Sequence, residues 1–194
     1  LYFMKSFAAD GPNEADPELK PRDRKWALSQ KDHPLFRKAF GDEDDRRADI
    51  IYVAPTVRAL ESAGLAFGTE GVPFKIDWRL KDRGNKALKT NYVRKMTELV
   101  DTGYLDRSYG DSMMRAYDDW QNSTKGQNEN DLLGDNDNRV ETFLHDLLER
   151  PEKHIIIVGH NNILDHAGGF GDFPGGVEAR ILDENGVISN FKND

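Results

Sequence analysis

The stretch IIYVAPTVRALESA, residues 50–63, decides the fold that we expect for this chain. Its apolar, β-branched start stops at Pro55, and an amphipathic helix pattern with Arg58 in the first turn follows at once. Such a strand–loop–helix junction places a cation at the carboxyl end of a strand, where open α/β sheets bind their ligands. The planar guanidinium of Arg58 suits phosphate or carboxylate. The alternative is a salt-bridged surface arginine, which is the commoner use of an isolated arginine.

A second junction of the same kind, HIIIVGHNNIL, occupies residues 154–164. Its four consecutive aliphatic residues, 155–158, predict a strand that is buried on both faces and therefore parallel and central. His160 follows where this strand stops, which makes it a candidate for a functional histidine rather than a structural one. The two junctions together predict an α/β protein with a mostly parallel central sheet.

Four segments resemble motifs of the histidine phosphatase superfamily, the phosphoglycerate-mutase-like proteins. VAPTVRALESA (53–63) is similar to the family's S-P-x-x-R-A-x-x-T-A segment, and VGH (158–160) is similar to V-S-H-G-G. DPELKPRDRKWA (16–27) is similar to D-P-x-L-T-x-x-G-x-x-Q-A, and 139–153 resembles the helix before the last catalytic strand. The resemblance covers most of residues 1–165 and implies a three-layer α/β sandwich.

The resemblance fails at the nucleophile. Family members follow their first strand with Arg-His-Gly, whose histidine becomes phosphorylated and whose arginine grips the phosphate. Here the expected strand over residues 1–4 is followed by Lys5, Ser6 and Phe7. Lysine keeps the positive charge of the arginine but loses its bidentate geometry. If Leu1-Tyr2-Phe3 is a tag remnant, the motif is still missing.

No other register restores Arg-His-Gly, because none of the five histidines (33, 145, 154, 160 and 166) lies in that context. A serine hydroxyl needs an adjacent base to become a nucleophile. Losing a nucleophile costs on the order of 10⁶ in turnover in other enzymes. We therefore expect that the chain forms no phosphohistidine.

Other pocket positions depart from the family as well. Asp82 is the nearest match to the carboxylate of the family's L-R-E stretch, which acts as general acid; the alternative is a solvated loop carboxylate. Two asparagines stand where the family has Gly-Gly, and Asn13 matches a family asparagine near the phosphate at a spacing shifted by one. The resemblance thus implies catalytic candidates Ser6, His160 and Asp82, and ligand-binding candidates Lys5, Arg58, Asn13, Asn161 and Asn162.

Composition favours one domain over residues 1–194, because this length is enough for a full core. The net charge of −8 argues against a nucleic-acid partner, which would need a basic stripe. The chain has no cysteine, hence no disulfide and no thiolate metal site, and we expect no metal or cofactor. No apolar stretch approaches the roughly 20 residues of a membrane span. With no visible secretory signal, we expect a soluble, intracellular protein.

Three functions remain open. The first is a pseudophosphatase kept for binding a phosphate-like or carboxylate small molecule, or kept as a subunit of a protein complex. The second is a repurposed enzyme that uses His160 as acid or base on a small molecule. The third is a residual phosphatase that uses Ser6 or water. The missing nucleophile favours the first.

The rest of the chain predicts the elements that such a fold needs. Tyrosine, methionine and tryptophan residues concentrate between 104 and 120, where they indicate core packing or a ligand or partner surface. The expected helices are 25–40 interrupted near Pro34, 56–67 ended by Gly68 as a C′ glycine, 91–103, 111–120, and one capped by Asn138; the expected strands are 50–53, 73–76, 155–158 and an edge hairpin over 177–191.

Overall fold

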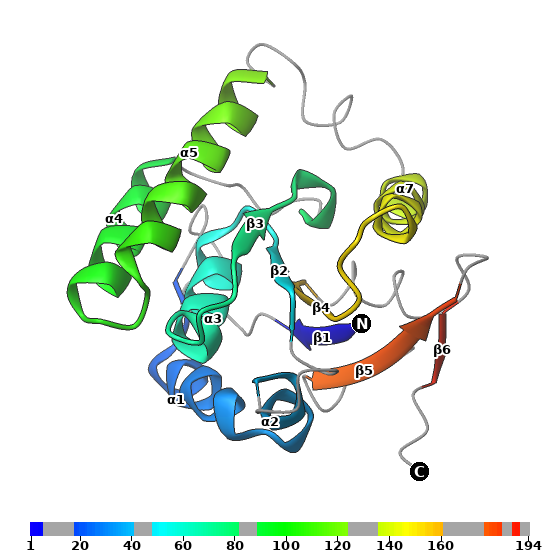
Figure 1. Cartoon of the computed structure of the whole chain (residues 1–194). Helices are drawn as coiled ribbons and strands as arrows, with labels where there is room; N and C mark the ends of the chain where they lie inside the picture. Colours follow the sequence, from blue (N-terminus) through cyan, green and yellow to red (C-terminus); the bar gives the residue numbers. More distant parts are fainter. Residues whose placement is uncertain are drawn as a thin grey trace.

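The computed structural model describes residues 1–5, 18–40, 48–81, 89–123, 136–160, 177–183 and 188–190. A six-stranded sheet in the order β3-β2-β4-β1-β5-β6 forms its centre (Figure 1). The strands are β1 (Tyr2–Lys5), β2 (Ile50–Val53), β3 (Phe74–Ile76), β4 (Ile155–Gly159), β5 (Val177–Leu182) and β6 (Ile188–Asn190).

The first four strands of that order are parallel to one another. β4 pairs in parallel with β1 on one side and with β2 on the other, and β2 pairs in parallel with β3. β5 runs antiparallel to β1 and to β6, so the predicted edge hairpin is present. All five residues of β4 are buried, as the aliphatic run predicted for a central parallel strand. The predicted mostly parallel sheet is therefore confirmed.

Helices cover both faces of this sheet. α3 packs against β2 and β4 on one face, with α1 and α4 packed on α3. α7 lies on the other face, where the ring of Phe143 meets that of Tyr52 on β2 at 5.3 Å between centroids. Figure 1 shows this arrangement of layers. The helices are α1 (Pro21–Ser29), η1 (Gln30–Asp32), α2 (Pro34–Phe40), α3 (Val57–Phe67), η2 (Trp78–Leu80), α4 (Lys89–Asp101), α5 (Arg107–Ser123) and α7 (Asn136–Leu148).

Two predicted helix caps are wrong. Gly68 ends α3 with φ −63°, so it does not adopt the left-handed conformation of a C′ glycine. Glycine is required at this position because the chain leaves no room for a side chain: a Cβ there would lie 2.1 Å from the backbone oxygen of Tyr104. Asn138 does not cap α7 but lies inside it, since the helix begins at Asn136.

The cluster of aromatic and methionine side chains on α5 belongs mainly to the core. Met113 and Tyr117 are fully buried, and Tyr117 stacks on Tyr92 of α4 with 4.3 Å between ring centroids. Tyr104, in the turn before α5, is 41% exposed. In the part of the chain that the structure describes, no helix has the length and apolar character to cross a membrane.

Candidate functional site

The carboxyl ends of the four parallel strands meet at one edge of the sheet. In the register of the sheet, Lys5 lies opposite Gly159, and Val53 lies opposite both Val158 and Ile76. The residues that follow these strand ends are therefore neighbours, although they come from distant parts of the sequence. In an open α/β sheet this edge is where a ligand is expected.

His160 follows β4 at this edge and is 2% exposed. Its Nε2 lies 2.8 Å from Oγ1 of Thr56, a hydrogen bond that joins residues 104 positions apart. Thr56 precedes α3 in an extended conformation, and its side chain does not cap that helix. The turn that holds it is fixed by backbone bonds from Ala54 N to Val158 O, 2.9 Å, and from Thr56 N to Ala54 O, 2.8 Å.

Two cations act on His160. Burial lowers the pKa of this imidazole well below its usual 6.5, and the charges of Arg58 and Lys81 lower it further. His160 is therefore a neutral imidazole at physiological pH. Arg58 lies half-buried in the first turn of α3, and Lys81 is buried directly after η2.

A network of buried charges fixes α3, the helix that carries Arg58. Glu61, one turn after Arg58, lies with Oε1 2.6 Å from Nε of Arg24 on α1 and 3.5 Å from Nζ of Lys95 on α4. Its Oε2 accepts a hydrogen bond from the backbone N–H of Leu19 at 2.9 Å. The helix is thus bound to α1, to α4 and to the segment before α1.

The structure brings together Arg58 and His160 among the residues predicted from the sequence. The backbone of Lys5 ends β1 at the same edge. Five further predicted residues lie outside the described part of the chain: Ser6, Asn13, Asp82, Asn161 and Asn162.

Sequence reasoning missed two residues at this edge. Thr56 lies between the end of β2 and Arg58, and its position in this strand–helix junction could have identified it from the sequence. Lys81 immediately precedes Asp82, so it lies within the stretch that resembles the family's L-R-E segment.

The other described histidines lie elsewhere. His154 precedes β4 at the opposite edge of the sheet, where its backbone N–H donates to Oδ2 of Asp49 at 2.9 Å. His145 is exposed on α7, and His33 precedes α2. Within residues 1–5, 18–40, 48–81, 89–123, 136–160, 177–183 and 188–190, no group of three or more histidine or carboxylate side chains is arranged to hold a metal ion.

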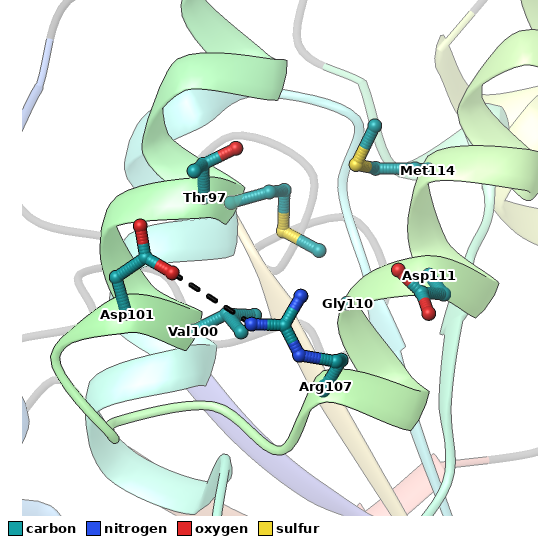
Figure 2. Close-up of a pocket in the computed structure, with 8 residues that line it drawn as sticks. Thr97, Val100, Asp101, Arg107, Gly110, Asp111 and Met114 are labelled. Atoms are coloured by element: carbon teal, nitrogen blue, oxygen red, sulfur yellow. Dashed lines mark ion pairs between the residues drawn. The ribbon is translucent and has the colours of Figure 1, made fainter.

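A cavity of about 60 Å³ lies between α4 and α5 (Figure 2). Its apolar lining comes from Met96, Val100 and Met114, and Arg107 reaches across its rim to Asp101, with 3.8 Å between Nη2 and Oδ1. The cavity shares no lining residue with the carboxyl edge. A cavity of this small size, with an exposed ion pair at its rim, is what a packing gap between two crossing helices would show.

Comparison with known proteins supports the fold. No family model and no curated protein matches the sequence. Among solved structures, phosphoserine phosphatase from Entamoeba histolytica in complex with 3-phosphoglyceric acid aligns over 100% of this chain and 96% of its own, with 16% identity and a TM-score of 0.50. A mycobacterial glucosyl-3-phosphoglycerate phosphatase aligns over 86% and 76%, with 14% identity and a TM-score of 0.49. The alpha-ribazole phosphatase from Shigella flexneri aligns over 84% and 75%, with 17% identity and a TM-score of 0.46. The first of these likenesses, at 16% identity and a TM-score of 0.50, concerns the fold alone, and that fold is the histidine phosphatase and phosphoglycerate-mutase-like one that the motifs predicted.

Proposed function

We propose that this chain, which has a phosphoglycerate-mutase-like fold, binds an anionic small molecule at the carboxyl edge of its sheet and does not process it through a phosphohistidine. The observation that carries the proposal is the combination of Arg58 and Lys81 acting on a buried, neutral His160. Two cations at one sheet edge attract phosphate-like or carboxylate ligands whether or not a nucleophile is present, because recognition and chemistry use different groups.

The absence of the family's chemistry follows from the sequence. Lys5, Ser6 and Phe7 occupy the positions of Arg-His-Gly. Ser6 would need a base to attack phosphorus. His160 is the described histidine at this edge, and its Nε2 is engaged with Thr56. A pseudophosphatase that retains its ligand site is therefore the function best supported.

Because His160 is neutral, the affinity for an anion should depend on pH differently than it would with a histidine of ordinary pKa. A histidine of ordinary pKa would lose its contribution to anion binding as pH rises past about 6.5. Here the proton is already lost well below that pH, so Arg58 and Lys81 carry the attraction from pH 6.5 to 8. Sulfate, which does not titrate in this range, is expected to bind equally well across it, and more tightly only at lower pH.

The decisive experiment restores the missing motif. Wild type and the triple variant Lys5→Arg, Ser6→His, Phe7→Gly are assayed with an aryl phosphate near pH 6. We expect negligible turnover in wild type and at least about a 100-fold gain in the variant, a fraction of the roughly 10⁶ that a missing nucleophile costs. Wild-type turnover of about 1 s⁻¹, an ordinary enzymatic rate, that disappears in His160→Ala would establish the residual phosphatase. A triple variant as inactive as wild type would contradict loss of the nucleophile alone.

One observation favours the repurposed enzyme as a second candidate. A buried histidine with a strongly lowered pKa beside a ligand site is suited to accept a proton. A role as an assembly subunit stays a prediction from the sequence.

A further inference from the structure

We propose that Thr56 and His160 form a nucleophilic pair, and that the hydroxyl of Thr56 takes up one phosphoryl group from an activated donor, an acyl phosphate. The proposal goes beyond the proposed function, which concerns the binding of an anion and not a reaction with it. Both residues lie at the same carboxyl edge of the sheet, and a hydrogen bond already joins them.

The pair has the geometry of an activated hydroxyl. Oγ1 of Thr56 lies 2.8 Å from Nε2 of His160, within the range of about 2.6–3.2 Å at which a base takes the proton of a nucleophile. Burial lowers the pKa of His160 well below 6.5, so the imidazole is neutral. In the tautomer that carries its hydrogen on Nδ1, Nε2 has the lone pair that accepts this proton.

Thr56 gives up its ordinary role to make this bond. Its carbonyl accepts the first hydrogen bond of α3, from Leu60 N at 3.0 Å. A threonine at this N-cap position usually also accepts a hydrogen bond from an N–H of the first turn, and loss of such a cap costs about 1 kcal/mol. Here the side chain makes no cap bond, because its hydroxyl is directed to His160. Local rules that are broken in this way are expected at functional sites.

The backbone keeps the two residues together. β2 and β4 pair in parallel with Val53 opposite Val158, so the chain leaves both strands at the same edge. Ala54 N donates to Val158 O at 2.9 Å, which ties the junction after β2 to the end of β4. Side chains placed by strand ends are held more precisely than side chains placed by loops.

The proposed step is a direct transfer to oxygen. Oγ1 of Thr56 forms a bond to phosphorus while the bond from phosphorus to the acyl oxygen breaks, and the carboxylate leaves with that electron pair. The hydroxyl proton passes to Nε2 of His160, which then releases it to solvent. The products are phosphorylated Thr56, a free carboxylate and a neutral imidazole.

The geometry selects the donor and prevents turnover. In-line displacement places the leaving group opposite the attacking oxygen, whereas His160 lies on the side of the attacking oxygen. A carboxylate leaves without a proton, but the alkoxide of a phosphate monoester needs one, so acyl phosphates react and monoesters do not. For the same reason His160 cannot activate a water that would attack the product in line. The phosphoryl group therefore stays, at the N-terminus of an 11-residue helix whose dipole favours negative charge.

The first test looks for the modification itself. Wild-type protein is incubated with acetyl phosphate near pH 7.5, and mass spectrometry of the intact chain and of its peptides follows the reaction. We expect one phosphoryl group on Thr56, stable in acid as a phosphate ester is and a phosphohistidine is not. Thr56 and His160 are 1% and 2% exposed, so the reaction requires local opening and should be slow. No phosphate on Thr56, or an acetyl group in its place, would overturn the proposal.

The second test asks whether His160 acts as the base. His160→Gln keeps a hydrogen-bonding partner for Thr56, yet phosphorylation should slow by at least about 100-fold, since general base catalysis contributes about 10²–10⁴-fold. Thr56→Val should abolish the reaction and Thr56→Ser should retain it, while the control Thr97→Val, which removes an exposed hydroxyl of α4, should leave the rate unchanged. Equal rates in wild type and a folded His160→Gln would reduce the pair to a structural hydrogen bond.

Calorimetric titration with sulfate separates this proposal from the proposed function. We expect sulfate to bind wild type and to slow the phosphorylation of Thr56, because donor and sulfate share one site. Sulfate binding by a protein that acetyl phosphate leaves unmodified would overturn the reaction and leave anion binding standing. Phosphorylation of Thr56 in a protein that binds no sulfate would support the reaction and count against the proposed function.

Discussion

Replacing Lys95 by methionine tests the buried charge network that fixes α3. Lys95 is fully buried on α4, and its Nζ lies 3.5 Å from Glu61 Oε1 and 2.6 Å from the carboxylates of Glu18 and Glu98. Methionine keeps the length of the side chain and has similar helix propensity, so the change removes mainly the charge.

The expected cost follows from the distances. At an effective dielectric constant of about 20, the attraction between Lys95 and Glu61 is about 5 kcal/mol. The contacts with Glu18 and Glu98 add little, because those carboxylates are 26% and 41% exposed. The lysine's own desolvation, several kcal/mol, is recovered when it is removed. Breaking one partner of a buried pair typically costs about 3–5 kcal/mol, and Arg24 still compensates Glu61 at 2.6 Å. We therefore expect a loss of about 3 kcal/mol.

The measurement is urea unfolding at pH 7, checked by thermal unfolding, in which a loss of this size lowers Tm by about 6–12 °C. Burial already raises the pKa of Glu61 above its ordinary 4.5, and loss of Lys95 should raise it further. A carboxyl whose folded pKa is raised takes up a proton in the folded state first, so the penalty in Lys95→Met should shrink as pH falls from 7 toward 4.5.

The comparison variant is Glu61→Gln, which breaks the same buried pair from the other side and should also cost about 3 kcal/mol, because Glu61 is 1% exposed and Arg24 loses a partner as well. The double variant should be more stable than Lys95→Met alone, because it removes the stranded carboxylate. A loss below about 1 kcal/mol in Lys95→Met, or a penalty that grows on acidification, would refute this reasoning.

Two further predictions concern stability. Because the pKa of His160 is lowered in the folded state, the contribution of this neutral histidine to the free energy of unfolding is complete above pH 6.5 and is lost as pH falls, by up to about 1.4 kcal/mol per pH unit. Urea unfolding between pH 5.5 and 7.5 should show this slope in wild type and not in His160→Gln, whereas parallel curves for the two proteins would contradict the prediction. Gly68→Ala should lower the free energy of unfolding by more than about 2 kcal/mol, because the new Cβ would lie 2.1 Å from Tyr104 O. Gly103→Ala, at φ +75° with open space around it, should cost only about 1–2 kcal/mol of backbone strain. Thermal unfolding compares the two variants, and equal losses would argue against the close approach at Gly68.

The sequence was most informative where burial and local chemistry agree. In the β2–α3 junction and in β4, the hydrophobic pattern and the residues that end each element lie within the segment itself. The bounds of these elements and their central place in the sheet were therefore predictable. Arg58 and His160 were expected at the carboxyl edge because each follows such a strand directly. The interruption at Pro34 was predictable for the same local reason, since proline lacks the donor that a continuous helix needs.

The remaining features depend on contacts between distant segments. Nothing in the neighbourhood of Gly68 reveals that the Tyr104 carbonyl will approach it, so the local rule for a helix-ending glycine gave the wrong conformation. In the sequence, Lys81 is one lysine in a charged stretch, and nothing near it shows that Arg139, 58 residues later, donates a hydrogen bond to its carbonyl. The lowered pKa of His160 likewise depends on burial and on two cations that the sequence does not place beside it.

The position of β4 between β2 and β1 has a consequence for how the chain acquires its structure. β1 and β2 are synthesised early, but neither is the other's neighbour in the sheet. Their shared partner begins only at Ile155. At roughly 5–20 residues per second, translation from β2 to β4 takes on the order of 5–20 s, during which both strands lack their central pairing. Pairing between strands this far apart in the sequence predicts slow folding. The Thr56–His160 bond joins the β2–α3 junction to the residue after β4, so this link across the site can form only once β4 has been synthesised.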